Sequence, residues 1–306
     1  MIQRIVLPLD GSRFAEHAIP LAVSIAIRTK ALLEFVGVSK PPFSSQYIRG
    51  VRIYDDDALR LGVARHQGYL TECRHRVCAL HACTASETVL MGSVFEALIA
   101  YVANSGADLV VMTTHGGGSP STSWLGSVSE RMIRESPVPL LLVRPTSDSC
   151  SMSELPTIRR IMVPSDGSKA AERGLRNAVE LARTFSADVL LFGVAAEAET
   201  SSGTAFDLTP SDQGRPLSEE AQALHADLTE SATRCSAPDV AITVLVESRA
   251  NTVKAIADVG AREGVDLLAM STHGRGAIGR FLLGSVADKV LRTSVIPVLL
   301  NGPDGH

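Results

Sequence analysis

Residues 4–12 read RIVLPLDGS, and residues 160–168 read RIMVPSDGS. Two more segments return in the same order: ADLVVMTTHG (107–116) as VDLLAMSTHG (265–274), and LGSV (125–128) as LGSV (283–286). The copies are offset by 156 residues at the start and by 158 later, so they differ by little more than loop insertions. Self-similarity of this kind predicts two copies of one domain in tandem. We expect the domains over residues 1–146 and 158–302, with a polar linker, 147–157, between them.

The composition agrees with two soluble domains. The 306 residues are 45% hydrophobic and 20% charged, so each half can bury its own core. A net charge of −4 and an aromatic content of 4% argue against a nucleic-acid binder. No apolar run reaches the ~18 residues of a membrane helix, and no signal pattern precedes the first expected strand. We therefore expect a cytoplasmic protein.

Within each copy, strand patterns alternate with helix patterns. The run at 5–9 is short and apolar, as expected for a strand covered on both faces. Apolar residues at helical spacing follow it in both copies: Ile19, Ala22, Val23 and Ala26, then Leu175, Ala178, Val179 and Ala182. Five such strands per copy predict an α/β fold, with a parallel doubly wound sheet and helices on both faces. The stretches Ser39–Asp57 and Glu197–Ser218 are expected to be long loops.

The segment after the fourth strand has the chemistry of a phosphate site. Such sheets bind ligands at the carboxyl ends of their strands. Gly284 and Ser285 stand where a helix begins, and the free amides of a helix start attract anions. Arg275 and Arg280 add positive charge, although no Walker loop is present. The alternative is that the glycine and serine only cap the helix.

The spacing of this segment is more specific than its glycines. In both copies a glycine is followed after nine residues by Gly-Ser, from Gly116 to Gly126 and from Gly274 to Gly284. This pattern, the leading strand and turn, and the closing GSVADKVLRTSVIPVLL resemble the universal stress protein family across both halves outside the linker and the two long loops. The resemblance implies two tandem Rossmann-like domains of the adenine-nucleotide α-hydrolase type, each with a five-stranded parallel sheet.

The resemblance also implies a site for ATP or ADP, with or without Mg²⁺, in each copy. The first-strand aspartate would face the adenosine, a valine ending the second strand would meet adenine through its backbone, and the loop after the fourth strand would hold ribose and phosphates. In the first copy these residues are Pro8, Asp10, Val38, Met112, Thr113, His115, Gly116, Gly126, Ser127, Val128 and Ser129. In the second they are Pro164, Asp166, Val194, Met270, Ser271, His273, Gly274, Arg275, Gly284, Ser285, Val286 and Ala287.

Both copies depart from the family pattern. Thr113 and Ser271 replace the first glycine of the motif, where a side chain either crowds the ribose or adds a hydroxyl contact. The first loop, 117–125, has no basic residue, whereas the second has two arginines. If only one site is occupied, we expect it to be the second.

Several residues invite other interpretations. Asp10, His115 and Ser127, or their equivalents Asp166, His273 and Ser285, invite a hydrolase triad, but a serine at a helix start is not held on a nucleophile elbow. Asp10 and Asp166 could instead cap the first helix. A zinc site is suggested by Cys73, Cys78 and Cys83 with His75 and His81, but the cysteines lack knuckle spacing. We expect no catalytic residue, no metal and unpaired thiols.

The last strand of each copy, 138–143 and 296–300, is expected at a sheet edge. An unpaired apolar edge promotes aggregation, and two copies on one chain can pair their edges about a pseudo-two-fold axis. We therefore expect an intramolecular pseudo-dimer and leave open a homodimer of the whole chain. The leading hypothesis is a nucleotide-dependent stress-response protein that signals through protein partners. The alternatives are an oligomeric scaffold with degenerate pockets, and an ATP-cleaving or adenylating enzyme.

Overall fold

The structure is a computed structural model that describes residues 2–40, 43–48, 51–54, 56–115, 125–145, 150–196, 218–271 and 283–301. Strands and helices alternate along this part of the chain, as predicted. The first domain contains β1 (Arg4–Pro8), η1 (Ala15–Ala18), α1 (Ile19–Thr29), β2 (Leu32–Ser39), β3 (Phe43–Ile48), β4 (Val51–Tyr54), α2 (Asp56–Leu80), β5 (Ala85–Met91), α3 (Val94–Ser105), β6 (Leu109–Thr113), α4 (Ser127–Glu135) and β7 (Leu140–Val143). The second contains β8 (Arg160–Pro164), α5 (Lys169–Phe185), β9 (Asp188–Ala195), α6 (Glu219–Arg234), β10 (Ile242–Ser248), α7 (Thr252–Arg262), β11 (Leu267–Ser271), α8 (Ser285–Thr293) and β12 (Val298–Asn301).

Each domain has the five-stranded parallel sheet that the sequence predicts. The strand order is β5-β2-β1-β6-β7 in the first domain and β10-β9-β8-β11-β12 in the second. The first strand is central in both, between the second and the fourth. The winding direction reverses there, so a ligand site is expected at the carboxyl ends of β1 and β6, and of β8 and β11.

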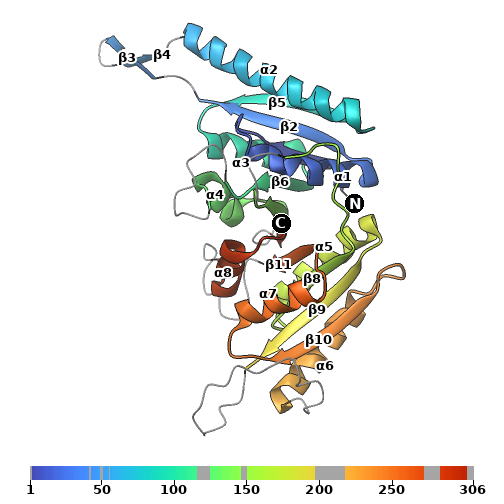
Figure 1. Cartoon of the computed structure of the whole chain (residues 1–306). Helices are drawn as coiled ribbons and strands as arrows, with labels where there is room; N and C mark the ends of the chain where they lie inside the picture. The colour runs from blue at the N-terminus through green and yellow to red at the C-terminus, as the bar shows by residue number, and fades with distance from the viewer. Residues whose placement is uncertain are drawn as a thin grey trace.

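The last strands of the two domains pair with each other, which confirms the expected edge pairing. β7 and β12 run antiparallel, with Leu141 opposite Leu299. The two sheets thereby become one sheet of ten strands that runs through both domains (Figure 1). Neither of these two short apolar strands is left as a free edge.

The sheet is covered on both faces. Successive strand residues point to opposite sides: Ile5 and Leu7 join a buried cluster with α1, α2, α5 and α6, whereas Val6 joins a second cluster with α3, α4, α7 and α8. The central strands are accordingly apolar at nearly every position, as parallel strands buried on both faces require.

One part of the first long loop has a structure that the sequence did not predict. β3 and β4 form an antiparallel hairpin within the stretch expected to be irregular, and it lies beyond the amino end of α2 (Figure 1). At 25 residues α2 is long, but it is polar. None of the helices in the described ranges is both long and apolar enough to cross a membrane.

The linker and the helices next to it connect the domains further. The hydroxyl of Ser24 in α1 donates to the carbonyl of Pro156 at 2.8 Å. The guanidinium of Arg28 lies 4.8 Å from the centre of the Phe185 ring, so α1 and α5 meet through a cation–π contact. Arg144, after β7, donates to the Ser294 carbonyl at the end of α8.

Candidate functional site

The turn after the first strand has the same geometry in both domains. The Asp10 carboxylate accepts a hydrogen bond from the Ser12 amide at 2.9 Å, and Asp166 accepts one from the Ser168 amide at 3.0 Å. Between them, Gly11 and Gly167 have φ angles of +84° and +77°, which glycine adopts at little cost. The carboxylates therefore shape the turn, while Ser168 is the residue that caps α5. Asp10 is exposed and Asp166 half-buried, and each stands two residues beyond the carboxyl end of a central strand, β1 or β8.

Strand register brings other expected site residues to the same edge. Ile5 pairs with Leu109, and this register puts Pro8, the last residue of β1, level with Met112, the residue before the end of β6. Pro8 also pairs with Val36, so Val38 lies just beyond on β2. The second domain repeats this arrangement with Pro164, Met270 and Val194.

The end of β6 is tied to the start of α4. The amide of Gly126 donates to the Thr114 carbonyl at 2.9 Å, and the buried hydroxyl of Ser129 donates to the Thr113 carbonyl at 3.1 Å. The Thr113 hydroxyl donates to the His115 carbonyl at 2.6 Å. Thr113 is 5% exposed, so this hydroxyl is occupied inside the loop. What Ser129 can offer a ligand is its backbone amide, and its equivalent in the second domain, Ala287, has no hydroxyl.

The helices that follow the fourth strands, α4 and α8, both begin at a glycine. Gly126 and Gly284 occupy the N-cap positions, and no side chain caps either helix. Side chains cap α5, α6 and α7, from Ser168, Ser218 and Asn251, whereas α1 and α3 also begin without a side-chain cap. Ser127 and Ser285 are exposed at the first turn, and Val128 and Val286 are half-buried. The first-turn amides at this edge are thus left for an anion.

Four expected site residues, Gly116, His273, Gly274 and Arg275, lie outside the described residues. In the first domain, the last described residue before this loop's gap is His115, whose Nδ1 lies 3.1 Å from the Thr114 hydroxyl. In the second domain, the last described residue before the corresponding gap is Ser271, which ends β11.

The cysteines and histidines near the end of α2 are not gathered into one cluster. No group of three or more potential metal ligands was found in the part of the chain that the structure describes. Cys73 is buried and accepts a hydrogen bond from Arg76 at 3.3 Å, and its burial raises the pKa of its thiol. His81 donates through Nε2 to the Met152 carbonyl at 2.7 Å. The residues that suggested zinc are therefore divided among separate contacts.

Cys73 belongs to a polar cluster that joins α2 to η1. Tyr69 donates to one carboxylate oxygen of Glu16, and Arg76 donates to the other at 3.1 Å. Burial, together with the nearby Cys73 and Glu16, raises the pKa of Tyr69, so the phenol stays protonated. The bonds of this cluster stabilise the packing of α2.

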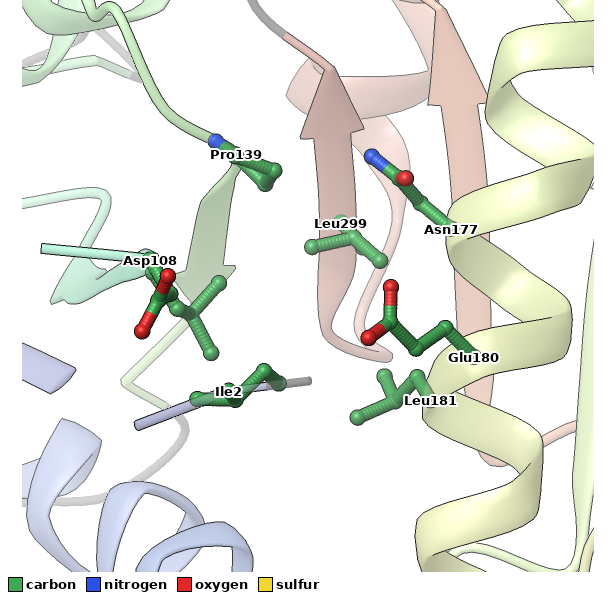
Figure 2. A pocket seen from close by; sticks show the side chains of 8 residues that line it. Ile2, Asp108, Pro139, Asn177, Glu180, Leu181 and Leu299 are labelled. Atoms are coloured by element: carbon green, nitrogen blue, oxygen red, sulfur yellow. The ribbon is translucent and has the colours of Figure 1, made fainter. Parts of the chain in front are cut away.

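A small cavity of about 150 Å³ lies between the domains, beside the amino ends of β6 and β7 (Figure 2). Asp108 and Pro139 face it from the amino ends of β6 and β7, and Asn177 and Glu180 face it from α5. Ligand pockets usually measure roughly 300–1,000 Å³, so a nucleotide does not fit here. The equivalent place beside α1 is occupied by the linker, which accepts the hydrogen bond of the buried Ser24.

Two contacts, one in the site and one at the opposite edge of the sheet, were missed at the sequence level. The Thr114 carbonyl accepts the amide of Gly126, the N-cap of α4, and at the amino end of β6 Asp108 accepts hydrogen bonds from the amides of Gln3 and Arg4 at 2.7 and 2.9 Å. Asp266 makes the same pair of bonds in the second domain. Both aspartates stand in the repeated segment, so their recurrence was the available signal.

Comparisons with known proteins agree with this geometry. The family model described as "Universal stress protein family" matches residues 1–144 and again 157–300. A universal stress protein of Thermus aquaticus is 30% identical over 145 residues, which is 47% of this chain and all of that protein. A universal stress protein of Mycolicibacterium smegmatis is 24% identical over 305 residues, covering 98% of this chain and 97% of that one.

A solved structure shows the same two-domain fold. The crystal structure of a universal stress protein from Archaeoglobus fulgidus superimposes with a TM-score of 0.67 at 19% identity, covering 98% of this chain and 96% of that chain. The repeated sheet order, the glycine-started helices at its carboxyl edge and the double family match lead to one conclusion. The chain belongs to the universal stress protein family and carries two domains of that family in tandem.

Proposed function

We propose that the protein binds an adenine nucleotide, ATP or ADP, at the carboxyl edge of each domain, and that this binding regulates a stress response through partner proteins. Its molecular function on this view is recognition rather than turnover. The observation that carries the proposal is the pair of glycine N-caps, Gly126 and Gly284, which stand at the edge where the winding of each sheet reverses.

The glycine at position 126 is not required by the backbone. Its φ is −68°, a value that any residue adopts. A Cβ built there would approach the Thr114 carbonyl oxygen at 3.5 Å, an ordinary contact. Neither backbone strain nor packing requires the glycine; it is a favourable N-cap residue, and we propose that it also lets a ligand approach the helix start closely. Gly284 has a φ of −58°, which any residue can likewise adopt.

The surrounding residues fit the parts of a nucleotide. The first-turn amides of α4 and α8 would hold phosphate oxygens. Asp10 and Asp166, already oriented by their turns, can accept a hydrogen bond from a ribose hydroxyl or an amine. Val38 and Val194 lie beyond the level of Pro8 and Pro164, in reach of the same edge. The arginines of the second loop add charge that the first loop lacks, so we expect tighter binding in the second domain.

The test is isothermal titration of ATP and ADP, with and without Mg²⁺, into wild type and into Gly126→Asp and Gly284→Asp. A carboxylate about 4 Å from a phosphate costs about 4 kcal/mol per charge pair at an effective dielectric of 20. Affinity at the altered site should therefore fall by at least about 100-fold. Nucleotide retained through purification, measured after acid denaturation, gives the occupancy of each variant.

Asn251→Asp is the matched control. It places the same new charge at the start of α7, where the Asn251 side chain already caps the helix and an aspartate can do so too. Asn251→Asp should bind ATP and ADP with the same affinity as wild type. If folded wild-type protein binds no nucleotide at millimolar concentration, or if the three variants bind alike, the proposal is wrong and an oligomeric scaffold becomes the better account.

A further inference from the structure

Two of the five cysteines meet at one turn. Cys78 lies in the last turn of α2, and Cys83 lies between α2 and β5. Cys78 is exposed and Cys83 is half-buried, while Cys73 and Cys235 are buried elsewhere. All five are free thiols in the structure.

The turn holds Cys78 and Cys83 in contact. The Cys78 thiol donates to the Cys83 carbonyl at 3.9 Å. The Cys83 amide in turn donates to the His81 carbonyl at 3.0 Å, so the chain folds back directly after the helix. This arrangement brings two side chains five positions apart to the same place, and a disulfide needs such an approach.

The two thiols have different environments. Burial raises the pKa of Cys83 to about 11, with further contributions from the charge and the hydrogen bond of Cys78. Cys83 is therefore protonated at neutral pH and shielded in part from solvent. Cys78 is the exposed thiol and therefore the one that an oxidant reaches first, and Cys83 is the cysteine that it contacts.

We propose that Cys78 and Cys83 are a redox modification site that forms a reversible intramolecular disulfide when the protein meets hydrogen peroxide. The Cys78 thiolate attacks one peroxide oxygen, the O–O bond breaks, and a sulfenic acid and hydroxide result; the hydroxide takes up the proton that the Cys78 thiol had released and becomes water. The Cys83 sulfur then attacks the Cys78 sulfur, the S–O bond breaks, and the leaving hydroxyl takes the Cys83 proton to form water. In total, two thiols lose two electrons and two protons, and one peroxide becomes two waters.

The site is specific to the first domain and lies against the linker. Cys235, near the end of α6, is buried, and the pKa of its thiol is raised by burial. No second cysteine lies near it in sequence, so the second domain has no equivalent pair. In the first domain, His81 of the same turn donates to the Met152 carbonyl of the segment that joins the domains. A Cys78–Cys83 bond would thus cross-link the turn that holds this segment.

The experiment treats the full-length protein with hydrogen peroxide, alkylates it under denaturing conditions and analyses tryptic peptides by mass. Cleavage after Arg76 leaves Cys78 and Cys83 together on one peptide, separate from the peptides of Cys73, Cys150 and Cys235. We expect this peptide to lose two hydrogen masses and both alkylation sites, and dithiothreitol to restore them. The other three cysteines should remain alkylated and serve as internal controls.

Two variants separate the roles. In Cys83→Ser, Cys78 should stop at the sulfenic acid and react with dimedone, whereas in Cys78→Ser the remaining Cys83 should stay alkylatable. Far-UV circular dichroism before and after peroxide checks that both variants stay folded. Disulfide-linked dimers through Cys78, over-oxidation of wild-type Cys78 without an S–S bond, or equal alkylation with and without peroxide would each overturn the proposal.

Discussion

The junction of β7 with β12, called the seam below, contains a leucine pair whose contribution to stability can be tested directly. Leu141 in β7 lies opposite Leu299 in β12, and the two side chains are 0% and 4% exposed. They are also equivalent positions in the repeat, so the pseudo-two-fold axis passes between them. Replacing either with alanine removes buried methyl groups from the join of the ten-stranded sheet.

The expected cost follows from this burial. A leucine-to-alanine change in a core costs about 2–5 kcal/mol, and both leucines have the burial of core residues. A directly opposed cross-strand pair contributes about 0.2–1 kcal/mol beyond the separate burial of its members. We therefore expect Leu141→Ala and Leu299→Ala each to cost about 2–4 kcal/mol, with a coupling energy of about 0.5–1 kcal/mol between them.

Urea unfolding followed by circular dichroism measures these free energies in a double-mutant cycle. Leu33→Ala is the control, since Leu33 is fully buried but lies in β2, away from the seam. Its loss should add to that of Leu299→Ala without coupling. If the double mutant is unfolded, the same cycle with valine replaces it. Strict additivity of the Leu141 and Leu299 changes would refute the pairing of β7 with β12.

Three further predictions concern single contacts. Asp266→Ala removes a carboxylate that accepts two backbone amides and should cost about 1–3 kcal/mol of unfolding free energy in urea, whereas no loss would show that these bonds are dispensable. Ser24→Ala removes the buried hydroxyl that donates to Pro156 and should cost about 1 kcal/mol and speed proteolysis in the linker; unchanged cleavage would contradict the anchoring role. Hydrogen bonds from Arg234 and Arg176 lower the pKa of Glu172 below its ordinary 4.5, so its stabilisation is present above that pH and is lost as the pH falls through the lower folded value. In Glu172→Gln the melting temperature should therefore decrease less steeply as the pH falls below about 4.5. The same decrease as in wild type would argue against this ion pair.

The sequence patterns predicted the strands and helices well because each element depends mainly on the residues of its own segment. The repeated apolar runs became the ten strands of the sheet, since a strand covered on both faces must be apolar throughout. The Gly-Ser of each copy became the start of a helix, as expected. The β3–β4 hairpin was missed because it lies in one of the two segments that differ between the copies, where no repeat supports a prediction.

The polar residues of the site were harder to assign from the pattern alone. The sequence left open whether Asp10 and Asp166 bind a ligand or cap a helix. In the structure they close their own turns, and in the second domain Ser168 takes the cap. The sequence also could not show that the Thr113 hydroxyl is occupied by the His115 carbonyl, because that bond depends on the path of the loop.

The amino-acid sequence by itself determined the duplication, the class of sheet and the place of the glycine-started helices, because periodicity and spacing act over a few neighbouring residues. Only the tertiary structure decided how the halves relate. It pairs β7 with β12, and it places the Cys78 thiol in contact with Cys83. It also places the linker against Ser24 of α1, whereas a cavity lies at the equivalent place beside α5. Apart from the contact of Cys78 with Cys83, which lies within the first domain, these features depend on how two similar domains are tethered by one short segment, and a single covalent tether cannot follow a two-fold axis.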